Sequence, residues 1–395
     1  MTVRANKPAF NIREKLKELE RPIGLKGSEL MKSETAQDAR DLVSAGRKNI
    51  IYNGSALINQ RGANGSISSG TTNIATDRWL FEVNSAGTWD LYQAADGPPG
   101  FGFCHKIDCT AANASLSSGS VIIFQQRLEG LDLQQLAKGT ASAKNLTLSF
   151  YVKSSKIGKY IVEFQDANNG RICQRSYNIN SANVWEYKTI TIPGDTSGVL
   201  TNSNGHSFTV RFWLAAGSLF QSGTLQTKWG STVNADRVVG QVNLADSNTA
   251  EWNVTGVQLE VGKNATDFEH RSYGEELTLC QRYYEKFVAD DGNGGYATFM
   301  KASKPSNTLL IGEPVFRVLK RAPGATLTFG GSMRISNVEE GETQVTLTGV
   351  QNYQIGTHGG YLVLTISNNT HGNGDAFRLE GRGDTSAYMA FSSEL

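Results

Sequence analysis

Residues 145–153 read NLTLSFYVK, and apolar side chains occupy every second position, at Leu146, Leu148, Phe150 and Val152. Because successive side chains of a β-strand point to opposite faces, this alternation predicts a strand with one face turned toward a core. Residues 208–214 repeat the pattern, with apolar side chains at each even position. The two stretches predict a β-sheet with one buried face.

Further strands are expected on both sides of these two. The same reading predicts strands at residues 121–128, 159–164, 172–179 and 185–192. Between two of them, residues 168–170 read Asn-Asn-Gly, which is typical of a hairpin turn. The 42 glycines of the 395-residue chain also favour many short strands joined by tight turns.

The last strand of this region changes its apolar face partway along. Trp252 and Val254 occupy even positions, whereas Val257 and Leu259 occupy odd ones. A strand exchanges its buried face only where an extra residue is inserted. A β-bulge is therefore predicted at residues 255–256, where glycine permits the unusual backbone angles.

These patterns divide the chain into four parts. Residues 1–46 are expected to be an N-terminal helical segment, and residues 47–270 an antiparallel β-sandwich or jelly roll. Residues 271–287 are predicted to be a short linking helix, and residues 288–395 a small distal β domain. The predicted fold class is mainly β.

The N-terminal segment carries a narrow apolar stripe. Ile12, Leu16 and Leu19 fall four and three residues apart on one helical face, and Phe10 precedes them. One short stripe on a charged helix cannot form a core by itself. We therefore expect residues 1–46 to pack against copies of themselves or against another protein.

Composition excludes several functions. The formal net charge is +1, which favours neither nucleic acid nor an anionic membrane as a partner. No apolar run is long enough to span a bilayer, and the opening MTVRANKPAF has no signal-peptide core, so synthesis in a cytoplasm without insertion into a membrane is expected. The five histidines and four cysteines form no zinc spacing, and no nucleophile elbow or phosphate loop is present. We expect no metal, no cofactor and no enzymatic activity.

Several short motifs occur together in order. They are KNIIYNG at residues 48–54, NQRG at 59–62, TDRW at 76–79, TGVQLEVG at 255–262, and FEHRSYGEELTLCQRYY at 268–284. This combination resembles a module that recurs in tail-fibre proteins of bacteriophages, including aquatic phages. The opening residues 6–19 also resemble the virion-attachment segment of such fibres.

The resemblance implies a homotrimeric structural protein of the virion tail. In such a fibre residues 1–46 would dock on a tail, baseplate or adaptor protein of the phage. The jelly roll would act as a carbohydrate-binding-like module for receptor binding and host adhesion, with a cell-surface polysaccharide as partner. An oligomer also multiplies weak glycan contacts through avidity.

Sugar binding requires flat apolar surfaces, which aromatic rings supply. Trp229 lies in a long polar loop between residues 216 and 248 and is the first candidate for ligand contact, together with Trp89 and Tyr92. Trp185 and Trp213 are also suitable by residue type, although most such rings on sandwiches belong to the core.

Two other functions stay open. A purely structural tail or head-decoration protein would use the sandwich for assembly alone. A host-glycan depolymerase would need two carboxylates across a cleft, and the sequence does not pair any of its Asp and Glu residues.

Overall fold

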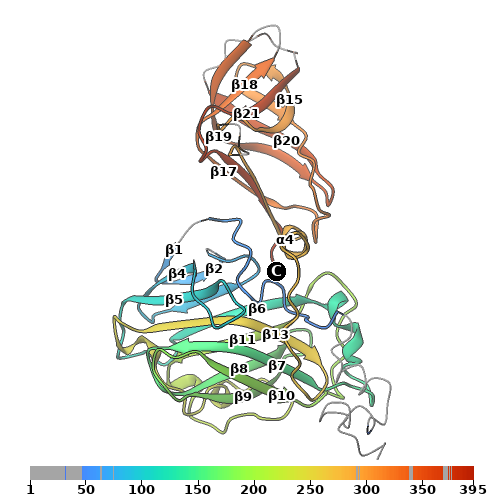
Figure 1. Cartoon of the computed structure of the whole chain (residues 1–395). Helices are drawn as coiled ribbons and strands as arrows, with labels where there is room; N and C mark the ends of the chain where they lie inside the picture. Colours follow the sequence, from blue (N-terminus) through green and yellow to red (C-terminus); the bar gives the residue numbers. More distant parts are fainter. Residues whose placement is uncertain are drawn as a thin grey trace, which may run out of the picture.

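The computed structural model describes Lys32 and residues 47–62, 65–73, 75–290, 292, 294–337, 341–367, 372, 374 and 376–395. The helices predicted within residues 1–46, with Phe10, Ile12, Leu16 and Leu19, lie outside the described residues. The described chain is mainly β, as predicted. A large sandwich stands below a smaller distal domain, and one short helix lies between them (Figure 1).

The sandwich consists of two antiparallel sheets. The six-stranded sheet has the order β1 (Gly65–Ile67), β4 (Thr88–Ala94), β5 (Cys104–Ala111), β13 (Glu251–Val261), β7 (Leu146–Ser154) and β10 (Glu186–Ile192). The seven-stranded sheet has the order β12 (Gly230–Ser231), β9 (Arg171–Ile179), β8 (Gly158–Asp166), β11 (His206–Ala216), β6 (Val121–Glu129), β3 (Leu80–Asn84) and β2 (Gly70–Thr72). A 3-10 turn, η1 (Gly130–Leu136), follows β6.

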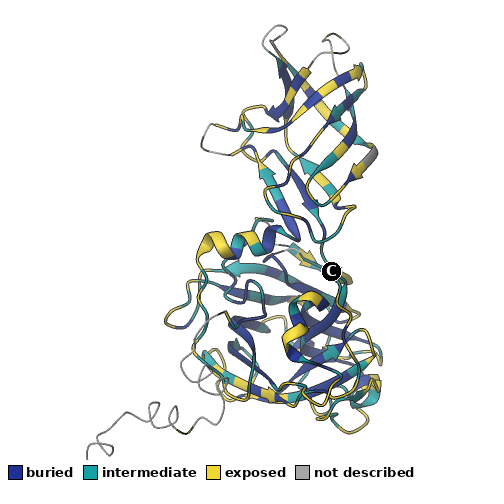
Figure 2. Ribbon diagram, turned by 90° about the vertical axis from the view of Figure 1, so that its right-hand side faces the viewer, coloured by how far each residue is buried: buried dark blue, intermediate teal, exposed yellow. Residues whose placement is uncertain are grey.

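The main core lies between these sheets, where buried residues gather in Figure 2. Phe150 of β7 meets Phe212 of β11 edge to face, with ring centroids 5.1 Å apart, and both side chains are fully buried. The alternation that predicted these two strands therefore also identified the face that each one buries. The turn at residues 168–170 joins β8 to β9, as predicted.

The predicted bulge in β13 is confirmed. Pairing with β7 shifts register between Thr255 and Gln258, and Gly256 has φ +60°. Trp252 and Val254 before the bulge, like Val257 and Leu259 after it, therefore belong to the same core.

The long segment after β11 covers the outer face of the seven-stranded sheet. It contains the 3-10 turns η2 (Ser218–Phe220), η3 (Asn234–Asp236) and η4 (Leu244–Asp246). Trp213 points outward from β11 and is fully buried, because Phe220 lies 5.5 Å from its ring and Arg237 lies 4.7 Å above it. This sheet is thus buried on both faces over that area.

The linking helix is shorter than predicted. Helix α4 (Tyr273–Gln281) begins with a capping box in which Ser272 and Glu275 bond each other's backbone N–H groups. The prediction of helix up to residue 287 is wrong, because Tyr284–Val288 form strand β14, which pairs with β22 (Tyr388–Ser392). Pairing with a strand distant in sequence overrides the local helical spacing.

The distal domain has its own core. Its three-stranded sheet has the order β14, β22 and β17 (Thr326–Gly330). Its closed barrel has the order β15 (Thr298–Ser306), β16 (Leu309–Gly312), β20 (Gly360–Ser367), β19 (Gly341–Ile355), β18 (Met333–Asn337) and β21 (Ala376–Gly381).

Buried ion pairs join the distal domain to the sandwich. The C-terminus returns to this junction (Figure 1), where Glu394 pairs with Arg78, a side chain that is 1% exposed. The Arg78 guanidinium also lies 3.4 Å from the centroid of the Tyr283 ring. Arg282 binds Glu129 through two hydrogen bonds of 2.9 and 2.8 Å.

The motif residues Gln60, Arg61 and Asp77 extend the same junction. The Gln60 side chain donates to the Tyr284 carbonyl at 2.7 Å, and Arg61 lies 3.2 Å from Asp77. Burial raises the pKa of Asp77 to about 6, and Arg61 opposes this shift. The motifs NQRG, TDRW and QRYY therefore build the contact between the two domains.

Candidate functional site

The candidate site lies on the outer face of the six-stranded sheet. Strands β7 and β10 pair there so that outward side chains stand directly opposite one another. The opposed pairs are Tyr151 with Tyr187, Ser149 with Thr189, and Thr147 with Thr191. The face thus carries two tyrosine rings followed by four hydroxyl-bearing side chains, of which Thr189 and Thr191 are exposed and Thr147 and Ser149 are buried.

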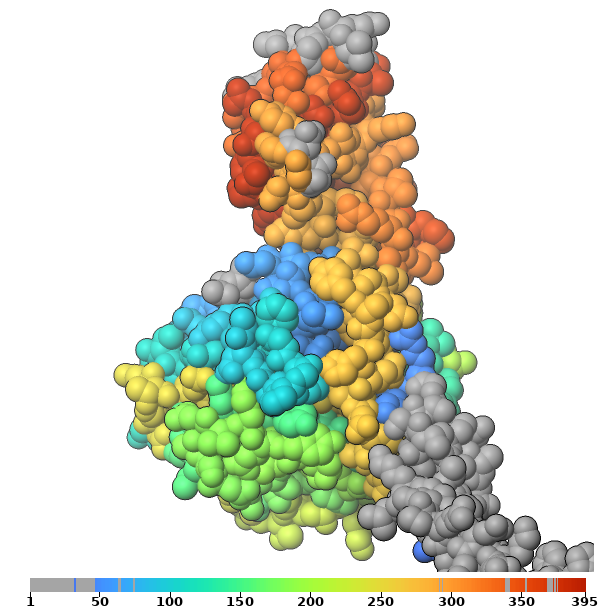
Figure 3. Space-filling view, in the orientation of Figure 1, coloured from blue at the N-terminus to red at the C-terminus, as the bar shows by residue number. Residues whose placement is uncertain are grey.

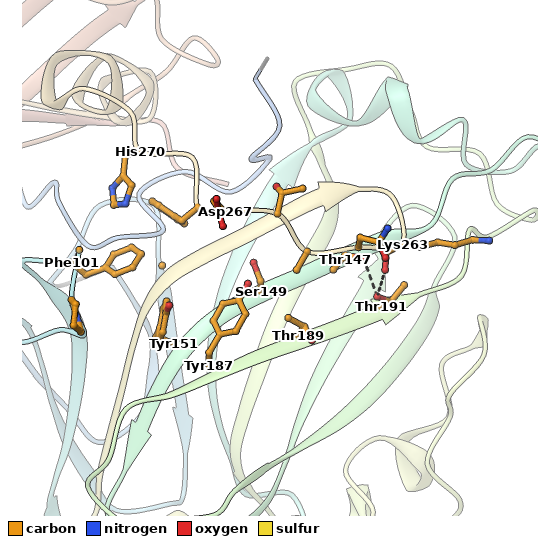
Figure 4. A pocket seen from close by; sticks show the side chains of 17 residues that line it. Phe101, Thr147, Ser149, Tyr151, Tyr187, Thr189, Thr191, Lys263, Asp267 and His270 are labelled. Carbon is orange, nitrogen blue, oxygen red and sulfur yellow. Dashed lines mark hydrogen bonds between the residues drawn. The ribbon is translucent and has the colours of Figure 1, made fainter. Parts of the chain in front are cut away.

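A cavity of about 670 Å³ opens over this face. Figure 4 shows Phe101 and His270 at one end, Lys263 at the other, and the paired side chains of β7 and β10 between them. We call this cavity the groove. Its lining residues are Pro99, Gly100, Phe101, Thr147, Ser149, Tyr151, Tyr187, Thr189, Thr191, Gly256, Lys263, Asn264, Ala265, Thr266, Asp267, Phe268 and His270.

Five aromatic side chains cluster at one end of the groove. The Phe101 ring lies 5.4 Å from Tyr151, 5.1 Å from Phe268 and 5.2 Å from His270. Tyr151 continues the cluster to Tyr187 at 4.9 Å. Tyr187 is 47% exposed, so part of its ring is open to a ligand.

The bulge glycine makes room for this cluster. A Cβ atom on Gly256 would lie 2.8 Å from Cζ of Phe101 and 3.2 Å from Cδ2 of Tyr151. Real Cβ atoms do not approach another carbon as closely as the first of these distances. Phe101 therefore lies over β13 because residue 256 has no side chain.

Residues 262–270 form one wall of the groove. Two outward side chains of β13 hold this wall in place. Glu260 accepts hydrogen bonds from the backbone N–H of Thr266 at 2.9 Å and from its hydroxyl at 2.7 Å. Gln258 accepts one from the Glu269 N–H at 2.8 Å. In Figure 3 the golden chain after β13 runs over the sandwich surface toward the distal domain.

The other end of the groove is polar. The hydroxyls of Thr147 and Thr191 lie 3.0 Å apart, and the Thr191 hydroxyl donates to the Lys263 carbonyl at 3.1 Å. Burial raises the pKa of Tyr187, and a hydrogen bond with Ser149 opposes the shift. The groove therefore combines apolar ring faces with neutral hydroxyls, and Asp267 is the one carboxylate among the lining residues, all of which are described.

Tyr92 lies on the same outer face, in a different hollow of about 440 Å³. Its hydroxyl donates to Asp108, and the Lys106 ammonium lies 5.3 Å from its ring centroid. Lys106 also pairs with Glu251 at 3.2 Å. Tyr92 is thus part of a charged network beside the groove and does not line the groove itself.

The two tryptophans predicted to contact a ligand lie elsewhere. The prediction for Trp89 is wrong, because its side chain is fully buried in the core and its indole N–H donates to the Ala86 carbonyl at 2.8 Å. Trp229 is half-buried, with its N–H bonded to the Pro193 carbonyl at 2.8 Å and its ring 6.0 Å from Phe208. It does not line the groove.

The groove residues were missed because the pattern was read for its buried face alone. Tyr151 follows the core residue Phe150, and Tyr187 occupies an odd position in a strand whose core residues, Ile190 and Ile192, occupy even ones. Rings at outward positions of two strands were the available signal. Phe101 had no comparable signal, because its position depends on contacts with residues distant in sequence.

In the described residues, no helix is long and apolar enough to cross a membrane. No family model matches the sequence, and no curated protein matches it.

Similar solved structures were found for about half of the chain. The enzymatically active domain of tailspike protein 4 of bacteriophage CBA120 matches with a TM-score of 0.29 and 12% identity, over 54% of this chain and 21% of that chain. A structure described as CBM4 matches with a TM-score of 0.27 and 13% identity, over 53% of this chain and 99% of that chain. A family 11 carbohydrate-binding module of a Clostridium thermocellum cellulase matches with a TM-score of 0.25 and 13% identity, over 52% of this chain and 100% of that chain. Because these TM-scores lie below 0.5, the proposals below rest on the residues of this chain.

Proposed function

We propose that this chain is a bacteriophage tail fibre that binds a host-surface polysaccharide in the groove. In this proposal residues 1–46 attach to the virion tail, baseplate or an adaptor protein, and the β domains face the host. The chain would act in the virion as a homotrimer after synthesis in the host cytoplasm.

The observation that carries the binding proposal is the pair of outward tyrosines. Tyr151 and the exposed Tyr187 stand opposite each other on the outer sheet face, beside the exposed hydroxyls of Thr189 and Thr191. A strand face turned to water normally carries polar side chains, so rings kept there call for a ligand. Sugars fit this surface because their apolar ring faces pack on aromatics and their hydroxyls exchange hydrogen bonds with Ser and Thr.

Binding without cleavage is the better match to the groove. Glycoside hydrolysis generally uses two carboxylates that flank the scissile bond. Among the lining residues Asp267 has no carboxylate partner. The proposed activity is therefore recognition.

Tyr187→Ala tests the binding proposal, with Tyr361→Ala as its control. Tyr361 is 38% exposed on β20 of the distal barrel, so its removal changes a similar surface away from the groove. Affinity electrophoresis in gels containing polysaccharide from candidate hosts would measure both. We expect Tyr187→Ala to lower affinity about tenfold or more, as for a central aromatic contact, and Tyr361→Ala to leave it unchanged. Equal affinities for all three proteins would contradict binding in the groove.

The tail-fibre proposal is supported by the motif order and by the narrow stripe of Ile12, Leu16 and Leu19. Light scattering of the full chain and of a chain beginning at Asn49 would test the trimer. A trimer in both places assembly in the β domains, and a trimer lost on truncation places it in the N-terminal segment. A monomer throughout would reject the trimeric fibre.

Release of reducing ends from a bound polysaccharide would instead indicate a depolymerase. Failure to bind any host cell would favour a purely structural tail or head-decoration protein.

A further inference from the structure

The groove continues into a second hollow at the edge of the sandwich. This hollow has a volume of about 470 Å³ and shares Thr191 and Lys263 with the groove. Its remaining lining residues are Asn145, Arg175, Ile192, Pro193, Thr227 and Lys228. It lies where β10 of one sheet meets β9 and the loop before β12 of the other, and we call it the basic hollow.

The basic hollow contains three cations and no carboxylate. Arg175, Lys228 and Lys263 line it, and none of them forms an ion pair with any residue that the structure describes. Nearby cations differ in this respect: Lys138 pairs with Asp195 at 2.9 Å, and Arg171 pairs with the same carboxylate at 2.8 Å. The hollow therefore carries three cations without a carboxylate partner, in a chain whose net charge is only +1.

Arg175 is held in position by the protein. Its Nη1 donates to the Gln174 carbonyl at 2.9 Å and to the Thr227 carbonyl. A guanidinium has five N–H donors in a rigid plane, so a fixed Arg175 retains donors for a ligand with paired anionic oxygens. Lys228 and Lys263 are exposed and add two mobile charges at the rim.

The basic hollow lies within reach of a sugar chain bound on the tyrosines. Pro193 lies six positions after Tyr187. That separation corresponds to roughly 20 Å along an extended strand that rises about 3.3 Å per residue. Several linked sugar rings can cover this distance. A chain that packs on Tyr187 and follows β10 past Thr189 and Thr191 therefore arrives at Arg175.

We infer that the ligand is an anionic polysaccharide, with a carboxylate, phosphate or sulfate substituent bound by Arg175, Lys228 and Lys263 in the basic hollow. This inference rests on the proposed glycan binding and specifies its substrate class. The aromatic end of the groove then supplies contact area that any sugar chain can use. The basic hollow supplies the discrimination between charged and neutral polymers.

A glycan array of neutral and acidic bacterial polysaccharides tests the inference. The array would be probed with the native chain, with the double variant Arg175→Gln/Lys228→Gln, and with Tyr187→Ala. Lys301→Gln removes one exposed cation of the distal barrel, away from both hollows, and serves as the control. Circular dichroism of each variant establishes that the sandwich is folded.

We expect the native chain to bind acidic polysaccharides in preference to neutral ones. The double variant should bind these acidic ligands about tenfold or more weakly, as expected when charge-assisted hydrogen bonds are lost, while Lys301→Gln binds as the native chain does. Binding should also weaken between roughly 0.1 M and about 1 M salt, a range in which the Debye length falls from about 10 to 3 Å.

The outcomes of this experiment distinguish the anionic-ligand inference from the glycan-binding proposal. Preferential binding of neutral polysaccharides, or acidic binding that the double variant leaves unchanged, overturns the anionic ligand while the glycan-binding function stands. Absence of binding to any glycan overturns both. Among acidic ligands, the chemical change that abolishes binding identifies the substituent that the hollow holds. Loss of binding after reduction of carboxylates indicates a carboxylate, and loss of binding after removal of phosphate indicates a phosphate.

Discussion

Replacing Gly256 with alanine should separate the architecture of the groove from the stability of the sandwich. Gly256 has φ +60°, where an L-residue costs roughly 1–2 kcal/mol. The new methyl group would also lie 2.8 Å from Cζ of Phe101, and overpacking of this kind costs typically about 1–3 kcal/mol. The sum is a loss of about 2–5 kcal/mol in the free energy of unfolding.

The chain offers a matched control for this substitution. Gly170 has φ +61°, and a Cβ atom there would meet nothing within 4 Å. Gly170→Ala therefore carries the backbone cost of roughly 1–2 kcal/mol without any side-chain clash. The difference between the two variants measures the contact between residue 256 and the Phe101 ring.

Urea unfolding followed by tryptophan fluorescence gives the two free energies, and affinity electrophoresis gives polysaccharide binding. We expect Gly256→Ala to lose more stability than Gly170→Ala and to bind polysaccharide more weakly, because Phe101 moves out of the groove wall. Gly170→Ala should bind normally. Equal stability losses together with unchanged binding by Gly256→Ala would refute the claim that the bulge positions Phe101.

Three further predictions concern other parts of the structure. Burial lowers the pKa of His105 to about 3, so the unfolded chain takes up a proton below about pH 6.5 that the folded chain does not. The stability of the native chain relative to His105→Gln should therefore fall by about 1.4 kcal/mol per pH unit below 6.5, and a pH-independent difference in calorimetry would contradict this. Glu285 and Lys320 form a fully buried ion pair at 2.5 Å, so Glu285→Gln should lower the free energy of unfolding in urea by about 3–5 kcal/mol. Lys156 and Asp246 form a partly exposed pair, so Lys156→Gln should lower it by no more than about 1 kcal/mol. Trp213→Ala should cost about 3–5 kcal/mol by detaching the loop from the seven-stranded sheet, and an unchanged free energy of unfolding in urea would contradict this packing.

Much of the sandwich could be predicted from sequence, because apolar and polar residues alternate along a strand that buries one face. The spacing of Leu148 and Phe150 predicted both strand β7 and its inward face. The change from even to odd apolar positions after Val254 predicted the bulge. The end of α4 could not be predicted in this way. Tyr284–Val288 satisfy a helical spacing but pair instead with a strand about a hundred residues later in the chain.

The candidate site was largely hidden for a related reason. Tryptophan in a polar loop suggested an exposed ring, yet Trp229 bonds Pro193 and packs toward the core, and Trp89 is fully buried. The groove instead uses outward positions of β7 and β10 and a ring placed over Gly256. The pairing register of distant strands determines which outward rings lie close together. The sequence pattern of a single strand does not reveal that register.

The most direct test of the central claim is a crystal structure of the chain with an oligosaccharide cut from a polysaccharide that it binds. The account predicts sugar rings in the groove, packed on Tyr187 and Tyr151 and within hydrogen-bonding distance of Thr189 or Thr191. A ligand bound instead in the distal barrel or on the loop around Trp229, with the groove empty at saturating oligosaccharide, would contradict it.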